Sequence, residues 1–345
     1  MKAAVLYAQK KIRVENIEKP AIEANEVLIK VKASGICGSD IPRVLGKASH
    51  YYPNVLGHEF SGEVVEIGSE VKNIHIGDKV SVAPLKPCHS CEDCLSGNHA
   101  LCKNYSFIGS REYGAWAEYV KAPEVNIVKL PDEVSYVQGA FLEPITVALH
   151  GLLVMDFKPM TSVAITGMGT IGLLTLQCAK IMGAKDITVF DIDDERLKIA
   201  GDLGADNVIN TMTDDINEKI KEITKGKGFE MVLETAGVPF TELLCLEIAG
   251  NKGSVMYIGT PHTEFTIQPK QFECMNRKEL KVKGSWMSYS APFPGKEWTL
   301  GANYLGTGQI KVEKLIDRII EIEDIKYAFE DIEAKKVSGK VIMQL

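Results

Sequence analysis

The chain has 345 residues, and we expect two packed domains because one domain ordinarily holds roughly 100–200 residues. It is 45% apolar and 25% charged, and 39 Lys and Arg against 46 Asp and Glu leave a net charge of −7. This composition excludes a disordered chain and disfavours binding to nucleic acid. No apolar run is long enough to cross a bilayer, and the first residues alternate like a strand rather than a signal peptide. We therefore expect the reducing cytoplasm, where the eight cysteines would be metal ligands or free thiols.

Residues 1–148 predict a strand-rich domain. Their β-branched runs, such as residues 27–36 and 77–84, are bounded by Gly, Pro and Asp and lack a long helical period. Residues 149–285 instead alternate strands with helices, which predicts a parallel, doubly wound sheet of the α/β class. Residues 286–345 return to short segments and end in a plausible strand, so we expect them to complete the first domain.

Four cysteines lie close together in a polar loop: Cys88, Cys91, Cys94 and Cys102. Thiols at this spacing suit a closed tetrahedral zinc site, which would cross-link a loop too hydrophilic to bury itself. An iron–sulfur cluster is the alternative, but the ferredoxin run continues with a shorter gap and a proline that this loop lacks. We predict a structural zinc ion here, with His89 and His99 as bystanders.

A second group of ligand-type residues is spread along the first domain: Cys37, His58, Glu59 and Glu143. Taken singly, each has an ordinary alternative as a buried thiol, a satisfied histidine or a surface carboxylate. As a set they supply sulfur, nitrogen and oxygen, the mixture that a catalytic zinc ion with an open position uses.

A glycine-rich pattern, G-x-G-x-x-G, stands between a predicted strand and an apolar helix, which is the context of a dinucleotide-binding loop. The predicted cofactor-binding residues are Gly167, Gly169, Thr170, Ile171, Gly172, Asp191 and Arg196. The helix start would receive the phosphates. Asp191, at the end of the next strand, would bind ribose hydroxyls and repel a 2′-phosphate, so NAD is favoured although Arg196 lies within reach. A cluster of turn glycines with a surface aspartate is the alternative.

These motifs together resemble the zinc-dependent medium-chain alcohol and polyol dehydrogenases. Residues 57–71 carry the family's zinc signature, G-H-E-x2-G-x5-G-x2-V, and the cysteine loop and the glycine loop follow in the family's order. The chain is most similar to the sorbitol-dehydrogenase branch, and residues 50–62 and 284–298 resemble its polyol-phosphate dehydrogenases.

The resemblance implies a GroES-like β-barrel catalytic domain and a Rossmann domain, with two zinc ions per chain, NAD as cofactor and a homo-oligomer, a dimer or a tetramer. It places the catalytic zinc on Cys37, His58 and Glu59, with Glu143 binding the metal directly or through water. Ser39 matches the hydroxyl residue that hands the substrate proton onward.

Two further positions qualify this expectation. Asp40 would orient a zinc ligand from behind. Pro42 stands where many relatives carry the histidine that continues the proton path through the cofactor ribose, so that path is closed to a side chain here.

The expected reaction is oxidation of a secondary alcohol of a polyol phosphate. Arg43 is the predicted phosphate clamp, because a guanidinium can bind phosphate through two parallel hydrogen bonds. Further candidates are Lys47, His50, Arg111 and Lys296, each of which could instead be a solvated surface cation. Trp286 is predicted to wall the sugar site.

Three alternatives stay open at this point. The first is a dehydrogenase of sorbitol, an arabitol phosphate or threonine on the same scaffold. The second is a binding protein that kept the fold and lost the chemistry, against which the intact set of ligand residues speaks. The third is an iron–sulfur electron carrier.

Overall fold

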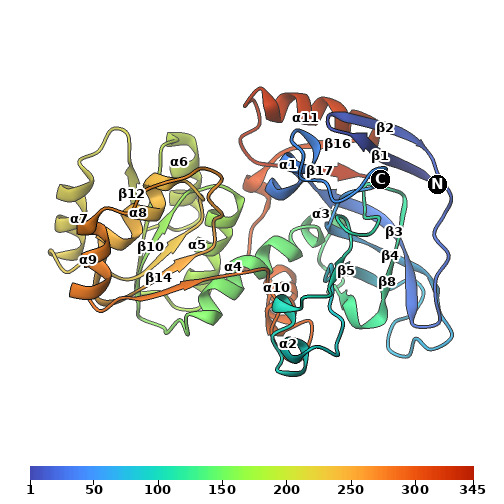
Figure 1. Ribbon diagram of the computed structural model, residues 1–345, viewed down its shortest axis with the longest axis horizontal. Helices are drawn as coiled ribbons and strands as arrows, with labels where there is room; N and C mark the ends of the chain where they lie inside the picture. The colour runs from blue at the N-terminus through green and yellow to red at the C-terminus, as the bar shows by residue number, and fades with distance from the viewer. The chain divides into compact units, whose positions relative to one another are not determined.

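The computed structural model describes residues 1–345 and divides into two compact units (Figure 1). The first unit consists of Met1–Thr146 and Tyr289–Leu345, and the second of Val147–Ser288. These boundaries lie two or three residues from the predicted ones at 148 and 286. Helix α4 (Leu142–Val154) runs across the first boundary. No helix of the chain has the length and apolarity needed to span a membrane.

The first unit is built on a seven-stranded sheet in the order β16-β17-β3-β4-β5-β9, with β8 also paired to β3. Its strands are β1 (Lys2–Ala8), β2 (Lys11–Asn16), β3 (Glu26–Gly35), β4 (Glu59–Ile67), β5 (Lys79–Val82), β6 (Leu85–Lys86), β7 (Ser106–Phe107), β8 (Tyr119–Pro123), β9 (Ile127–Lys129), β16 (Ile316–Ile320) and β17 (Lys340–Gln344). Its other α-helices are α1 (Ile41–Val44), α2 (Glu92–Leu95), α3 (Tyr136–Gly139), α10 (Lys296–Gly306) and α11 (Ile325–Glu333).

The C-terminal segment completes the first unit because its last strand enters the sheet. β17 pairs antiparallel with β3, and β3 pairs on its other side with β4 (Figure 1). Apolar side chains of β3 and β4, including Val27, Ile29 and Phe60, are fully buried in the core of this sheet. Consecutive residues are buried at both ends of β3 and in the first half of β4, so this part of the sheet is covered on both faces, and exposed polar residues such as Lys30 and Glu66 are few.

The second unit is a six-stranded parallel sheet in the order β12-β11-β10-β13-β14-β15. Its strands are β10 (Ser162–Thr166), β11 (Asp186–Asp191), β12 (Asn207–Asn210), β13 (Phe229–Glu234), β14 (Ala249–Tyr257) and β15 (Lys281–Gly284). Its helices are α5 (Thr170–Ile181), α6 (Asp194–Asp202), α7 (Ile216–Thr224), α8 (Pro239–Ile248) and α9 (Pro269–Arg277). The strand order reverses between β10 and β13, the point at which open α/β sheets bind nucleotides. The predicted doubly wound sheet is confirmed.

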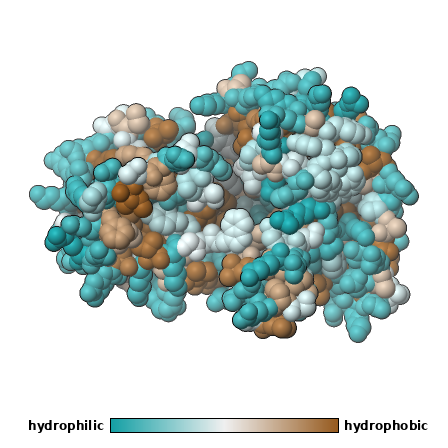
Figure 2. Space-filling view, viewed as in Figure 1, coloured by the Kyte–Doolittle hydropathy of each residue, from teal (hydrophilic) through white to brown (hydrophobic).

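The apolar residues 254–261 do not form an edge that could pair with another subunit, because β14 lies inside the sheet, between β13 and β15. The sheet ends at β12 on one side and at β15 on the other, and all four residues of β15 are exposed. The two lysines of β15 are typical of a protected edge strand. On the face shown in Figure 2, polar side chains predominate and apolar patches interrupt them.

Candidate functional site

The scattered ligand residues of the first unit come together where β3 ends and β4 begins. Cys37 follows β3, whereas His58 and Glu59 stand at the start of β4, which runs antiparallel to β3. One ligand atom of each of these three residues lies within 4.8 Å of the others, and His58 and Glu59 are buried. Strand pairing therefore assembles the sulfur, nitrogen and oxygen donors that were predicted to hold zinc.

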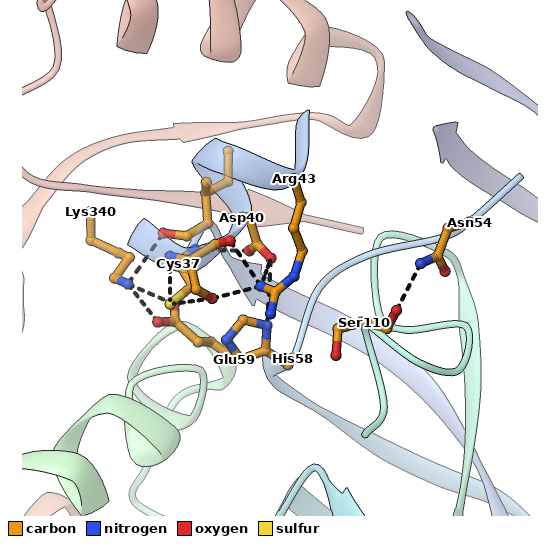
Figure 3. A network of polar contacts seen from close by, with 10 residues as sticks. Cys37, Asp40, Arg43, Asn54, His58, Glu59, Ser110 and Lys340 are labelled. Atoms are coloured by element: carbon orange, nitrogen blue, oxygen red, sulfur yellow. Dashed lines mark hydrogen bonds and ion pairs between the residues drawn. The ribbon is translucent and has the colours of Figure 1, made fainter. Parts of the chain in front are cut away.

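A buried ion pair holds the carboxylate of this cluster. Lys340 Nζ lies 2.7 Å from both Oε1 and Oε2 of Glu59 and also donates to the carbonyl oxygen of Ile36 at 3.2 Å (Figure 3). Gly35 lies on β3, which separates the strand of Lys340 from the strand of Glu59. A Cβ on Gly35 would come within 2.4 Å of Glu59 Oε2, so only glycine leaves room for this carboxylate. Burial alone would lower the pKa of Lys340, but the negative charges of Glu59 and Cys37 outweigh burial and raise this pKa. The lysine is therefore charged and neutralises the carboxylate.

Behind the cluster, Asp40 is fully buried and contacts two of the predicted ligands. Its Oδ2 accepts a hydrogen bond from the backbone N–H of Cys37 at 3.1 Å, and its Oδ1 lies 3.6 Å from His58 Nδ1 (Figure 3). Burial raises the pKa of Asp40, and the charges of His58 and Arg43 act against that rise. Because Asp40 faces Nδ1, Nε2 is the nitrogen of His58 left for a metal, as in the carboxylate–histidine pairs of known metal sites.

The pKa values of Cys37 and Glu143 are both raised in the absence of a cation. Burial, followed by the charge of Glu59, raises the pKa of Cys37. Burial also raises the pKa of Glu143 to about 7, although the charge of His58 lowers it. A bound divalent ion would reverse both effects, since a coordinating thiol is deprotonated outright. The donor set thus fits zinc, with Glu143 beside the compact group of three rather than within it.

Ser39 and Arg43 form the open side of this site. Arg43 Nη1 donates to Ser39 Oγ at 2.7 Å and to the Ser39 carbonyl oxygen at 2.9 Å, and it lies 3.4 Å from Asp40 Oδ1 (Figure 3). The hydroxyl of Ser39 in turn donates to Cys37 Sγ at 3.4 Å. The side chain of Arg43 is 18% exposed, and Ser39 is exposed. The predicted phosphate clamp and the predicted proton-relay hydroxyl are therefore direct neighbours.

The cysteine loop folds into a second cluster, whose four sulfur atoms lie within 4.8 Å of one another. The Cys88 and Cys94 sulfurs are 4.0 Å apart and those of Cys91 and Cys102 are 3.9 Å apart. A zinc–sulfur bond of about 2.3 Å gives a tetrahedron with edges of about 3.8 Å, and these two distances are close to that value. Hydrogen bonds from Ser90, from its backbone and from that of Cys91 lower the pKa of Cys88 to about 5.

The histidines of this loop are not members of the cluster. His89 and His99 contact each other and Phe293 edge to face, with ring centroids 5.3–5.7 Å apart. They pack the cysteine loop against the segment before α10, which agrees with the prediction that they are bystanders.

In the second unit, the glycine loop borders a cavity of about 480 Å³. The cavity is lined by Gly167, Gly169, Phe190, Asp191, Ile192, Arg196, Thr211, Met212, Thr235, Ala236, Val238, Phe240 and Thr241. Gly167 has φ of +87°, which only glycine adopts easily, and a Cβ on Gly172 would lie 1.8 Å from its carbonyl oxygen. Thr170 and Ile171 form the first turn of α5, directly after this loop.

Asp191 is fixed by the backbone beside the same cavity. Its Oδ2 accepts from the N–H of Met168 at 2.5 Å, and its Oδ1 accepts from the N–H groups of Ile192 and Asp193 at 2.8 and 3.0 Å. Arg196 also lines the cavity, and its buried Nε has no hydrogen-bond partner. The loop, the acidic residue and the arginine thus share one cavity, as the sequence predicted.

The other predicted substrate residues lie on the surface. Lys47, His50, Arg111 and Lys296 are exposed. Partial burial lowers the pKa of His50, as do the charges of Arg111 and Arg43, so these three groups are close enough to interact. Trp286 belongs to the second unit and is 55% exposed. Its part in substrate binding stays a prediction.

Sequence reasoning missed two sets of residues. Lys340 stands 281 positions from Glu59, and no motif marks it. Thr211, Met212 and Phe240 line the nucleotide cavity because they follow the carboxyl ends of β12 and β13. The rule that ligands bind at those ends could have found this second set.

Comparison with known proteins agrees with this geometry. Residues 23–132 match the family model "Alcohol dehydrogenase GroES-like domain", and residues 170–301 match "Zinc-binding dehydrogenase". The chain is 40% identical to galactitol 1-phosphate 5-dehydrogenase of Escherichia coli K12 over 99% of both chains. It is 33% identical to sorbitol dehydrogenase of Bacillus subtilis 168 over 96% of this chain and 93% of the relative.

Solved structures give the same result. The crystal structure of galactitol-1-phosphate dehydrogenase from Escherichia coli is similar over the whole of both chains, with a TM-score of 0.96 and 39% identity. A zinc-binding dehydrogenase from Sinorhizobium meliloti 1021, solved with NADP, covers 100% of this chain and 99% of its own with a TM-score of 0.90 and 30% identity. An Escherichia coli CFT073 alcohol dehydrogenase, solved with NADH, has the same coverage and TM-score at 27% identity.

These similarities confirm the resemblance to polyol-phosphate dehydrogenases, and they confirm the predicted cofactors, zinc and a nicotinamide dinucleotide, at the level of the family. The alternative of an iron–sulfur carrier loses its support. The chain belongs to the zinc-binding dehydrogenases with a GroES-like domain, a family of zinc-dependent alcohol and polyol dehydrogenases.

Proposed function

We propose that this chain oxidises a secondary alcohol of a polyol phosphate with NAD, converting galactitol 1-phosphate to a ketose phosphate such as tagatose 6-phosphate. The observation that carries the proposal is the buried cluster of Cys37, His58 and Glu59, which offers zinc one sulfur, one nitrogen and one oxygen. The 40% identical relative named for galactitol 1-phosphate supports the choice of substrate.

The protein's own groups have distinct tasks in this reaction. Cys37, His58 and Glu59 would hold the catalytic zinc, and Glu143 would serve as a further ligand or hold a water molecule there. When bound, zinc supplies the Lewis acidity that lowers the pKa of an alcohol. Lys340 keeps the Glu59 carboxylate in place through its two 2.7 Å contacts.

Ser39 would take the proton of the substrate hydroxyl. Its Oγ accepts that proton while its own hydrogen leaves the bond to Cys37 Sγ and passes to solvent, to which Ser39 is exposed. This route needs no histidine at position 42, where the chain has proline. The hydride leaves the carbon that carries the substrate hydroxyl, so the alcohol becomes a ketone. Bound NAD supplies the hydride acceptor.

The cavity beside the glycine loop would hold the cofactor. The buried carboxylate of Asp191 favours NAD, because a 2′-phosphate near it would meet a like charge. Arg43 would bind the substrate phosphate through its remaining donors. We further propose a homo-oligomer, a dimer or a tetramer, and a cytoplasmic location, in keeping with cysteines that cluster as metal ligands.

A substrate panel tests this function. NADH formation would be followed with galactitol 1-phosphate, galactitol, sorbitol, arabitol phosphates and threonine, each with and without a chelator. We expect the highest kcat/KM with galactitol 1-phosphate, and loss of all activity with the chelator. A higher kcat/KM for sorbitol or threonine would replace the proposed substrate, and sorbitol is the first rival because of the sorbitol dehydrogenase relative.

A further inference from the structure

We propose that Arg43 is a positioning residue that links recognition of the substrate's phosphate to the proton-relay hydroxyl of Ser39, so that the phosphate raises kcat as well as affinity. This inference rests on the proposed function and concerns how the same site distinguishes phosphorylated from unphosphorylated polyols.

The side chains of Arg43 and Ser39 contact each other directly. All three side-chain hydrogen bonds of Arg43 within the protein are made by Nη1, and two of them are with Ser39, at Oγ and at the carbonyl oxygen. A hydroxyl has one hydrogen and two lone pairs. Here the hydrogen is directed to Cys37 Sγ and one lone pair accepts from Arg43, so the position of the hydroxyl oxygen depends on where the guanidinium lies.

One edge of the Arg43 guanidinium forms no hydrogen bond within the protein. Nε and Nη2 of Arg43 have no protein partner, and neither is buried without one. These two groups form the parallel pair of donors that binds a phosphate through two oxygens. A phosphate can therefore bind at this edge while Nη1 keeps its hold on Ser39.

A second arginine and a histidine belong to the surroundings of Arg43. Arg111 and Arg43 both lie close enough to His50 for their charges to lower its pKa. Arg111 is held by Tyr105, with its guanidinium carbon 4.2 Å from the ring centroid and Nη2 donating to the hydroxyl at 3.3 Å. Two arginines thus lie near His50 in a chain whose net charge is −7, and their charges suit a phosphate dianion. Arg111 has no bond to Ser39, so it can contribute to affinity alone.

A phosphate bound to Arg43 would also affect catalysis through Ser39. An arginine side chain with a free edge retains rotamer freedom, and a phosphate bound there removes that freedom. Because Nη1 of the same guanidinium holds Ser39 Oγ, the bound phosphate also fixes the relay hydroxyl in its working position, and small displacements of such groups cost large factors in rate. An unphosphorylated polyol lacks this effect even when it saturates the enzyme.

The test compares kcat and KM of the zinc-loaded enzyme for galactitol 1-phosphate and galactitol in four variants. In Arg43→Ala, we expect kcat for galactitol 1-phosphate to fall about tenfold or more, toward the value for galactitol, and KM to rise. Arg43→Lys, which keeps the charge but not the fork, should also lose kcat. Arg111→Ala should raise KM with kcat unchanged. Arg277→Ala, an exposed arginine of α9, is the control and should match the wild type.

Three further measurements test the link between the two residues, and one of them, calorimetry, does not depend on turnover. In a Ser39→Ala background, Arg43→Ala should cause no further loss of kcat, because both substitutions remove one linked function. Calorimetric titration with inorganic phosphate should show binding to the wild type and binding at least about tenfold weaker in Arg43→Ala, and inorganic phosphate should raise the rate of galactitol oxidation by the wild type only.

The inference fails if Arg43→Ala raises KM and leaves kcat unchanged, as Arg111→Ala should, or if the losses from Ser39→Ala and Arg43→Ala multiply. Either result leaves Arg43 as a phosphate clamp and leaves the proposed function intact. Failure of the wild type to oxidise galactitol 1-phosphate would instead remove the proposed function itself.

Discussion

Replacing Lys340 by methionine should destabilise the first unit by about 3–5 kcal/mol, the range for removing one partner of a buried ion pair. The side chains of Lys340 and Glu59 are 6% and 2% exposed, and Nζ lies 2.7 Å from both carboxylate oxygens. Methionine fills a similar volume, so the loss comes from the unpaired carboxylate rather than from a cavity.

Urea denaturation of chelator-treated protein measures this loss. Intrinsic fluorescence reports the first unit because Trp116 and Trp298 are both at most 1% exposed within it. Lys10→Met is the matched control: its ion pair with Glu333 is half exposed, so it should cost less than about 1 kcal/mol.

The pairing itself is tested by combining Lys340→Met with Glu59→Gln, since the double variant should lose less than the sum of the two single variants. A loss below about 1 kcal/mol for Lys340→Met, or additive losses in the double variant, would show that the buried pair does not stabilise the first unit.

Three other predictions concern the remaining sites. Cys91→Ala should reduce the zinc content by one ion per chain and lower the Tm, as measured by elemental analysis and calorimetry; an unchanged zinc content would contradict the tetrahedral site. Asp191→Ala should raise kcat/KM with NADP relative to NAD by about tenfold or more, and an unchanged ratio would show that this carboxylate does not select the cofactor. Burial and the charge of Glu234 raise the pKa of Glu242 from 4.5 to about 7, so its stabilising contribution is complete below pH 4.5 and lost as pH rises through 7. Glu242→Gln, which cannot lose this proton, should therefore flatten the fall of the Tm between about pH 5 and 8, and an equally steep curve would oppose the assignment.

The parts of this molecule that the sequence predicted are those whose causes are local. The spacing of Cys88, Cys91, Cys94 and Cys102 confines four thiols to one loop, and the glycine pattern fixes a turn before a helix. Such signals need no knowledge of distant strands. The β–α alternation of the second unit is equally local, and it was sufficient for the class of sheet.

The parts that the sequence did not predict depend on strand pairing. Lys340 reaches Glu59 only because β17 and β4 lie on either side of β3, and an alternation of strands does not specify that order. The edge strand β15 was missed because its lysines resemble a loop. The contact between Arg43 and Ser39 is different: the two residues are four positions apart across a helical turn, so the spacing could have predicted it.

Zinc content and NAD reduction should be measured on the same preparation of Cys37→Ser, because we propose that Cys37, His58 and Glu59 hold the zinc ion on which oxidation of the alcohol depends. Wild type should carry about two zinc ions per chain, and Cys37→Ser should keep about one, in the cysteine loop. Cys37→Ser should form NADH from galactitol 1-phosphate at less than about a thousandth of the wild-type rate. A Cys37→Ser enzyme with one zinc ion and wild-type turnover would show that oxidation does not depend on this ion.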